Sequence, residues 1–434
     1  MRKAALHNLG CKVNAYETEA MQRMLEEAGY EIVPFTEKAD VYVVNTCSVT
    51  NMADRKSRQM LHKAKKNNPD SIVVATGCYV QTSEKEVLDD LSVDIVIGNN
   101  RKHELVGLID EFMNNSVDDS VDDINDGKHE FEELFIDQTA EHTRAFIKVQ
   151  DGCNQFCSYC IIPYARGRVR SRKFDNVVAE VKRLAANGFK EVVLTGIHLS
   201  SYGVDFEENT GLLDLIKAVN DVDGIERIRL GSLEPKIVTE EFASELSKLK
   251  KICPHFHLSL QSGCDATLKR MNRKYTAEEY ERGCMLLRKY FEHPAITTDV
   301  IVGFPGETDE EFEQTADYLK KIHFYEMHIF KYSKRKGTRA AVMPDQVPEQ
   351  IKTKRSEQLI ACGHDMSVEF RNYYIGKTDE VLFEEKATIG DKEYFVGYTK
   401  EYVKVAKDTN ENLENTIVSG RITGRLTDEI LLFE

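Results

Sequence analysis

Residues 152–160 read Gly-Cys-Asn-Gln-Phe-Cys-Ser-Tyr-Cys, and Cys153, Cys157 and Cys160 within them form a Cys-x3-Cys-x2-Cys motif. The motif directly follows an apolar run that is predicted to be a strand. Three thiolates on one loop can hold three irons of a [4Fe–4S] cluster, which normally takes four Cys ligands, so one iron keeps an open position. The alternative is structural zinc, which needs a fourth ligand nearby. Ile161 follows the motif, so the sequence favours an iron–sulfur cluster.

A repeating strand–helix pattern surrounds this motif from about residue 144 to residue 333. Strands are predicted at 146–149, 192–195, 227–230, 256–260, 297–302 and 326–330. Helical patterns lie between them, and a further helix is predicted over 348–370. Six strand–helix units are more than a small open sheet contains, so the pattern predicts a barrel-like α/β fold, closed or partly closed.

Residues 1–113 show a similar alternation, with strands predicted at 4–9, 41–45, 72–76 and 93–97. Asn14 and Glu17 resemble a capping box at the start of a helix, and a second helix is predicted over 54–67. The repetition predicts a parallel sheet covered by helices.

Three further cysteines, Cys11, Cys47 and Cys78, each follow one of the first three of these strands. Because the carboxyl ends of parallel strands share one edge of a sheet, we expect these thiols to converge on a second cluster site. The alternative is that they are ordinary buried residues.

Two other segments complete the predicted organisation into domains 1–113, 142–370 and 371–434. Residues 110–141 contain twelve acidic residues and one basic residue, a net charge of −11, which predicts a solvated acidic linker over 114–141. After residue 376 the apolar period changes to two, which predicts a five-stranded all-β barrel.

Charge is distributed unevenly along the chain. The 434 residues carry a formal net charge of −15, which argues against a broad, non-specific nucleic-acid-binding surface. Residues 144–190 nevertheless carry a net +7. Within them, four arginines alternate with other residues, and an extended chain would present all four to phosphates on one side. A second basic cluster consists of Lys331, Lys334, Arg335, Lys336 and Arg339.

Several classes of protein are excluded by the pattern of apolar residues. No apolar run approaches the roughly 18 residues that span a bilayer. The first residues lack the apolar core of a signal peptide, so we expect a cytoplasmic protein whose ten cysteines are thiols or metal ligands.

These motifs resemble the radical S-adenosylmethionine (SAM) superfamily and, within it, the methylthiotransferases, over nearly the whole chain. Tyr159 stands at the customary aromatic position of the cluster motif. Segments 161–167, 195–203, 230–235 and 258–264 are similar to the branch that modifies N6-threonylcarbamoyladenosine at position 37 of tRNA. The resemblance implies an open parallel α/β sheet domain, a partial (β/α)6 barrel and a small, OB-like all-β TRAM barrel.

The resemblance also implies an enzyme with two [4Fe–4S] clusters and two SAM molecules per turnover. The Cys153, Cys157 and Cys160 cluster would bind SAM, and one electron would generate a 5′-deoxyadenosyl radical that removes hydrogen from C2 of adenine. The second cluster would carry the sulfur. The implied partners are a tRNA anticodon stem-loop with the threonylcarbamoyl group and an electron donor such as flavodoxin or ferredoxin.

Two kinds of alternative remain at this stage. A sister enzyme would act on isopentenyladenosine in tRNA or on an aspartate of a ribosomal protein. A different class would be a non-catalytic iron–sulfur RNA-binding protein or sulfur carrier.

The remaining site residues are predicted from strand ends and basic positions, and no catalytic group is assigned beyond the cluster ligands. The predicted SAM-binding residues are Tyr159, Gly196, Ile197, Ser232, Glu234, Gln261 and Gly303. The predicted RNA-binding residues are Arg166, Arg168, Arg170, Arg172, Lys404, Lys407, Arg421 and Arg425. The cysteines assigned to packing or the surface are Cys253, Cys264, Cys284 and Cys362.

Overall fold

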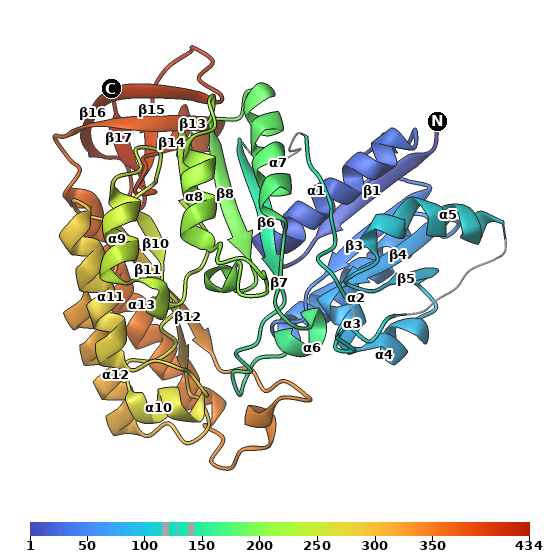
Figure 1. The fold of residues 1–434 in the computed structure, drawn as a ribbon, viewed down its shortest axis with the longest axis horizontal. Coiled ribbons are helices and arrows are strands. Elements are labelled where there is room, and N and C mark those ends of the chain that lie inside the picture. The colour runs from blue at the N-terminus through green and yellow to red at the C-terminus, as the bar shows by residue number, and fades with distance from the viewer. Residues whose placement is uncertain (115–120, 128, 138–142) are drawn as a thin grey trace.

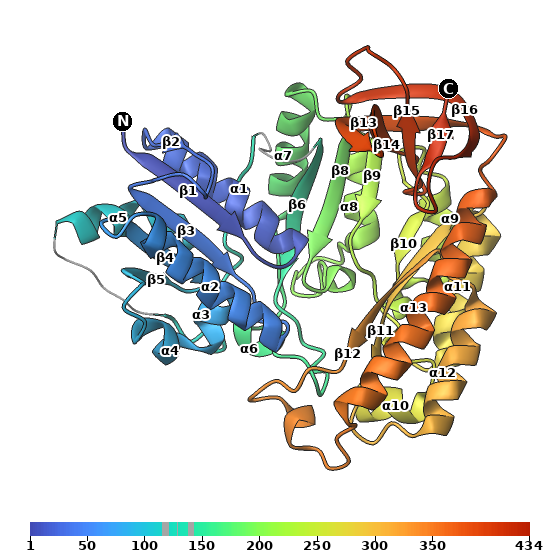
Figure 2. The same ribbon diagram turned by 180° about the vertical axis from the view of Figure 1, so that it is seen from behind.

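The computed structural model describes residues 1–114, 121–127, 129–137 and 143–434. An N-terminal parallel sheet lies beside a larger α/β part, and a small β-barrel covers one end of the latter (Figures 1 and 2). Among the described residues, no helix is both long and apolar enough to cross a membrane.

The N-terminal sheet has the order β2-β1-β3-β4-β5, and all its pairings are parallel. Its strands are β1 (Lys3–Asn8), β2 (Glu31–Ile32), β3 (Val41–Thr46), β4 (Ile72–Gly77) and β5 (Ile95–Ile97). One face is covered by α1 (Lys12–Glu27) and α5 (Leu105–Met113). The other face is covered by α2 (Asn51–Asn67), α3 (Cys78–Thr82) and α4 (Glu84–Leu88).

The start of α1 corrects one prediction. Cys11 is the N-cap of α1, so Asn14 and Glu17 lie inside the helix rather than forming a capping box, and both are buried. The two-residue strand β2 was not predicted, because it is too short to show a period of two.

The central part contains six strands in the predicted places. They are β6 (Arg144–Asp151), β8 (Glu191–Gly196), β9 (Arg227–Leu230), β10 (His255–His257), β11 (Ala295–Val302) and β12 (Glu326–Lys331). Strands β6, β8 and β9 pair in parallel, as do β10, β11 and β12, and single bridges such as Ile228 with Ile252 connect the two groups. In the described chain, β12 does not pair with β6, so the partial barrel is confirmed. A short β7 (Arg170–Ser171) runs antiparallel to β6.

Helices enclose the outer side of these strands. They are α6 (Ile162–Arg166), α7 (Phe174–Ala186), α8 (Leu212–Asn220), α9 (Glu240–Ser247), α10 (Asp265–Arg270), α11 (Ala277–Tyr290), α12 (Asp309–Ile322) and α13 (Glu349–Asn372). Except for α6, which packs against α3 of the N-terminal part, their apolar faces and the outward side chains of the strands form one continuous core.

The C-terminal part is a five-stranded barrel, as predicted, and it is closed in the order β13-β14-β15-β17-β16. Its strands are β13 (Thr378–Ile389), β14 (Lys392–Tyr398), β15 (Lys404–Lys407), β16 (Thr416–Arg425) and β17 (Leu431–Phe433). It is attached to β9, because Arg227 donates to the carbonyl oxygen of Tyr398 at 2.8 Å and Arg229 to that of Lys400 at 2.9 Å.

The prediction of a solvated linker is wrong for its described second half. Leu134 and Ile136 are buried in the central core. Glu132 is also buried and lies 3.1 Å from the imidazole of His103. Apolar residues at alternate positions therefore fix this segment against the protein despite its acidic composition. Residues 115–120, 128 and 138–141 of the predicted linker lie outside the described residues.

Candidate functional site

The structure brings Cys11, Cys47 and Cys78 to one edge of the N-terminal sheet. Cys11 begins α1, Cys47 follows β3, and Cys78 is the first residue of α3. A Cβ atom on Gly10 would lie 3.0 Å from Sγ of Cys47, so the turn before the first thiol contacts the second. Burial and the nearby Cys78 thiol raise the pKa of Cys47 to about 11. The three thiols therefore share one place, although their positions in the sequence are far apart.

A buried network of charges adjoins this place. Arg166 donates from Nε to Sγ of Cys78 at 3.2 Å, and from its two Nη atoms to Glu17 at 2.8 and 3.0 Å. Nζ of Lys148 lies 2.7 Å from Glu17 and 2.6 Å from Asp151. The network therefore joins α1 of the N-terminal sheet to β6 and α6 of the central part.

The carboxylates of this network do not balance its cations. Arg166, Lys102 and Lys148 face Glu17 and Asp151, and Arg170 also faces Asp151. Burial raises the pKa of Glu17, but the three cations outweigh burial and hold this pKa well below its ordinary value. As a thiolate, which is the form that binds metals, Cys78 would supply part of the missing negative charge.

The second triplet, Cys153, Cys157 and Cys160, lies on the loop between β6 and α6. Gly152 starts this loop at φ +71°, and a Cβ there would lie 1.8 Å from the carbonyl oxygen of Arg168, so no side chain fits. Burial raises the pKa of Cys153 to about 11 and that of Cys160 to about 12. A buried thiolate needs a cationic partner, and iron would provide one.

The segment after α10 positions this loop. The amide of Ser158 donates to the carbonyl oxygen of Met271 at 2.9 Å, and Nη1 of Arg273 donates to Sγ of Cys157 at 3.2 Å. Sequence reasoning missed Arg273, because it belongs to no motif and is over 100 residues from the thiol that it contacts.

Glu234 connects the loop to the end of β9. Its carboxylate accepts from Nε2 of Gln155 at 3.2 Å, and lies 3.2 Å from Nε2 of His198 and 3.9 Å from Arg273. Burial raises the pKa of Glu234, but hydrogen bonding and charge from His198, with Arg273, lower it below its ordinary value. Glu234 is therefore a charged group beside the cysteine loop.

Both triplets fit a cluster better than a single zinc ion. Zn–S bonds are about 2.3 Å long, so two thiolates on one zinc lie at most about 4.6 Å apart. Within the described chain, neither triplet has all three of its sulfur atoms within 4.8 Å of one another. Three thiols in a wider arrangement suit three irons of a [4Fe–4S] cluster.

The predicted SAM-binding residues lie mostly along the same edge of the central strands. Gly196 ends β8 with Ile197 after it, while Ser232 and Glu234 follow β9, the former exposed and the latter buried. Gln261 follows β10 at φ +73°, and its amide donates to the β11 backbone at 2.8 Å.

Tyr159 and Gly303 have different surroundings. The Tyr159 ring packs edge-on against Phe304, with centroids 6.3 Å apart. Gly303 is buried against α13, where a Cβ would lie 2.3 Å from Cγ of Lys352. Gly303 therefore shapes the turn that carries Phe304, and its contact with SAM stays a prediction.

The prediction of one exposed row of arginines is wrong. Arg166, Arg170 and Arg172 are buried, with exposed fractions of 0%, 6% and 0%. The chain bends from α6 into β7, so alternation does not place the four side chains on one face. The buried carboxylate partners of these three are Glu17, Asp151 and Glu180. Arg168 is exposed, with its guanidinium 4.5 Å from the centre of the Phe156 ring.

The basic residues of the C-terminal barrel differ in exposure. Lys404 and Lys407 on β15 are half-buried, whereas Arg421 and Arg425 on β16 are exposed. Arg425 pairs with Asp428 at 3.2 Å. These residues do not form a single exposed patch.

The loop after β12 joins the two α/β parts. Arg335 lies 2.5 Å from Asp54 and donates to the Ser48 hydroxyl at 2.7 Å, so one member of the second basic cluster is used in the junction. Its neighbours Lys334 and Lys336 are exposed.

A cleft of about 420 Å³ opens at this junction. Its walls come from α2, α3, α6 and the loop after β12. Tyr164 lines the cleft with 46% of its surface exposed, and Arg335 and Lys336 line it as well. The cleft is therefore lined by residues that follow one cysteine of each triplet, Gln81 after Cys78 and Ile161 after Cys160.

Comparisons with known proteins identify similar sequences. Residues 147–319 match the Radical SAM superfamily, and residues 3–98 match Uncharacterized protein family UPF0004. The chain is 43% identical to threonylcarbamoyladenosine tRNA methylthiotransferase MtaB of Bacillus subtilis (strain 168), over 97% of this chain and 94% of that protein. It is 40% identical to tRNA-2-methylthio-N(6)-dimethylallyladenosine synthase of Thermoanaerobacter sp. (strain X514), over 87% and 81%.

A solved structure shares the fold. The radical S-adenosylmethionine methyltransferase TsrM from Kitasatospora setae, with cobalamin and a [4Fe-4S] cluster bound, matches with a TM-score of 0.58 at 16% identity. The match covers 79% of this chain and 74% of TsrM. At this identity, the likeness concerns the fold alone.

Proposed function

This chain belongs to the radical SAM methylthiotransferases, and we propose that it converts N6-threonylcarbamoyladenosine at position 37 of tRNA into the 2-methylthio derivative. The observation that carries the proposal is two separate cysteine triplets near the junction of the two α/β parts, with a cleft lined by segments that follow Cys78 and Cys160. The choice of substrate is supported by the 43% identity to a relative named for threonylcarbamoyladenosine. We assign the reaction to the cytoplasm, with an electron donor of the flavodoxin or ferredoxin class.

The cysteines have two distinct roles in this proposal. One [4Fe–4S] cluster, with SAM on its open iron, would be held by Cys153, Cys157 and Cys160. The cluster that carries sulfur would be held by Cys11, Cys47 and Cys78. When bound, these groups supply the electron that cleaves SAM and the sulfur and methyl groups that are added to adenine.

The other residues of the chain orient and shield these groups. Arg273 and Arg166 each donate a hydrogen bond to a ligand sulfur, and such bonds tune the reduction potential of a cluster. Glu234, beside the cysteine loop, would accept hydrogen bonds from SAM. The packed rings of Tyr159 and Phe304 would exclude water from one side of the cluster held by this loop.

The cleft at the junction is the proposed site for the anticodon loop. Single-stranded RNA is recognised by stacking of unpaired bases on aromatic rings and by contacts to phosphates. The exposed ring of Tyr164 offers a stacking surface, and Lys336 lines the same cleft. Arg168 adds positive charge, because it lies over the Phe156 ring, which packs edge-on against Tyr164.

Replacing Arg168 tests this binding mode. Arg168→Gln is expected to weaken tRNA binding and to lower the slope of log affinity against log salt by about 1, as for loss of one phosphate contact. Fluorescence anisotropy at several salt concentrations measures both quantities. The matched control is Arg282→Gln, an exposed arginine on α11. Equal slopes for wild type and Arg168→Gln would remove this arginine from the interface.

Nucleoside mass spectrometry tests the substrate. In tRNA from a strain that lacks the gene, the 2-methylthio derivative of threonylcarbamoyladenosine is expected to disappear and its precursor to accumulate. Wild-type protein should restore the product, whereas Cys47→Ala should not. Unchanged levels of this nucleoside would refute the assignment. Loss of the 2-methylthio derivative of isopentenyladenosine instead would indicate the sister substrate, which is the kind named for the 40% identical relative.

A further inference from the structure

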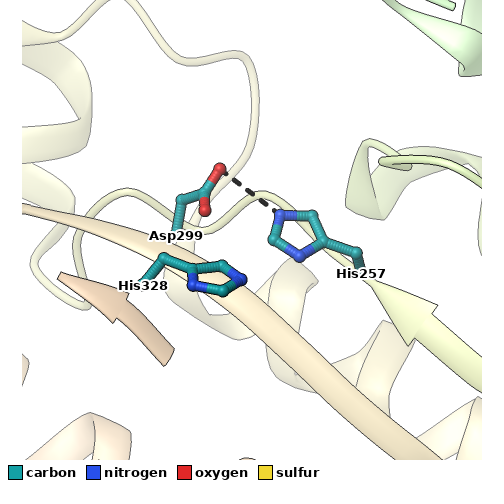
Figure 3. A group of neighbouring side chains, drawn as sticks. All are labelled: His257, Asp299 and His328. Carbon is teal, nitrogen blue, oxygen red and sulfur yellow. Dashed lines mark ion pairs between the residues drawn. The ribbon is translucent and has the colours of Figure 1, made fainter. Parts of the chain in front are cut away.

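Three potential metal ligands meet on the central sheet, apart from both cysteine triplets. His257 ends β10, Asp299 lies within β11, and His328 lies within β12. One ligand atom of each residue lies within 4.8 Å of the others. Figure 3 shows the carboxylate and the two imidazoles gathered at one point above neighbouring strands.

The register of the parallel strands accounts for this meeting. Asp299 and His328 are direct partners across β11 and β12, and His257 is the partner of Thr297, two residues before Asp299. Their apolar neighbours along each strand pack in the core beneath the helices. Because side chains alternate along a strand, these three lie on the opposite, inner face of the sheet.

Hydrogen bonding orients one of the imidazoles. Nδ1 of His257 lies 3.0 Å from the hydroxyl of Thr297, as for a ligand histidine fixed by its second nitrogen. Nε2 of His257 is buried and, within the described chain, makes no hydrogen bond. It nevertheless lies 3.3 Å from Oδ2 of Asp299. The imidazole and the carboxylate form an ion pair when the imidazole is protonated, and the neutral imidazole can bind a metal ion at the same place together with the carboxylate (Figure 3).

The His328 ring completes the group. It lies beside the His257 ring, with centroids 5.9 Å apart and planes 28° from parallel. His328 is exposed, so an ion can reach the site from solvent.

We propose that His257, Asp299 and His328 bind one divalent transition-metal ion. Two imidazoles and one carboxylate suit zinc or ferrous iron, whereas magnesium and calcium prefer oxygen ligands alone. Three protein ligands leave coordination positions open on the inner face of the sheet for water or an oxygen of a bound molecule. The site does not depend on the substrate proposed above.

Zinc binding to the cluster-loaded protein tests the proposal, with Zn²⁺ itself as the probe. After anaerobic dialysis against limiting Zn²⁺, elemental analysis is expected to find about one zinc per chain and unchanged iron. X-ray absorption at the zinc edge should give nitrogen and oxygen at about 2.0–2.2 Å, without sulfur at about 2.3 Å. Absence of zinc, or the presence of zinc–sulfur scattering, would overturn the proposal.

Variants separate this site from adventitious binding. His328→Ala and Asp299→Asn should each weaken zinc binding by at least about 10-fold, and Thr297→Val by about 10- to 100-fold, because it removes the partner of Nδ1. The control is His364→Ala, which removes an exposed histidine of α13. Zinc affinity that is equal in His328→Ala and the control would also refute the site.

Discussion

Cys157→Ala is expected to abolish reductive cleavage of SAM while leaving about half of the iron in place. The reconstituted protein should bind about eight irons per chain as two [4Fe–4S] clusters, and the variant about four. Cys157 is one of the three proposed ligands on its loop, and Arg273 is positioned to donate to its sulfur. Its loss should disrupt that cluster alone. Iron analysis and assay of 5′-deoxyadenosine after dithionite reduction measure the two effects.

Two further variants make this result specific. Cys78→Ala is expected to lose the other four irons, to retain 5′-deoxyadenosine formation and to form no methylthio product. Cys362→Ala removes a half-buried thiol of α13 outside both triplets and should change neither quantity. Loss of all iron in Cys157→Ala would contradict two separate sites. Four irons and no SAM cleavage in the wild type would favour a non-catalytic iron–sulfur protein.

Arg166→Gln is expected to lower the free energy of unfolding by about 3–5 kcal/mol, the usual cost of breaking a buried ion pair by removing one partner. The guanidinium is fully buried and donates to Glu17, Asp151 and Asn14 as well as to a cysteine sulfur. Without it, two buried carboxylates each lose a partner. Chemical denaturation followed by circular dichroism measures the change.

The neighbouring Arg168→Gln is the control for this prediction. Arg168 is exposed, and its replacement should change the free energy of unfolding by no more than about 0.5 kcal/mol. Combining Arg166→Gln with Glu17→Gln should cost much less than the sum of the single changes, because the two side chains interact directly. Additive effects would mean that the network does not act as one unit.

Local patterns in the sequence were sufficient for most of the fold. The strand predicted at 227–230 coincides with β9, where apolar residues alternate with arginines, and the other five central strands also lie in the predicted places. The capping box failed for a physical reason. Asn14 and Glu17 have the right spacing, but both side chains accept hydrogen bonds from Arg166, about 150 residues away.

In the candidate site, the sequence predicted the positions of the cysteines but not the contacts made by the residues around them. Cys153, Cys157 and Cys160 form a local motif, and the other cysteines could be located by their places after strands. Arg273 could not be found, because its position depends on how α10 packs against the cysteine loop. The alternation of four arginines was misinterpreted, because sequence spacing does not reveal that carboxylates from other elements meet them in the interior.

The charge network at the junction limits how this protein can be recombined with its relatives. Arg166 belongs to the central part, whereas Glu17 belongs to the N-terminal sheet, and neither side chain reaches water. A chimera that exchanged residues 1–113 alone would have to bring a helix with a carboxylate and an amide at the same two positions. Otherwise the engineered interface would enclose an unmatched cation. The natural unit of exchange is therefore the first sheet together with the segment that ends at α6.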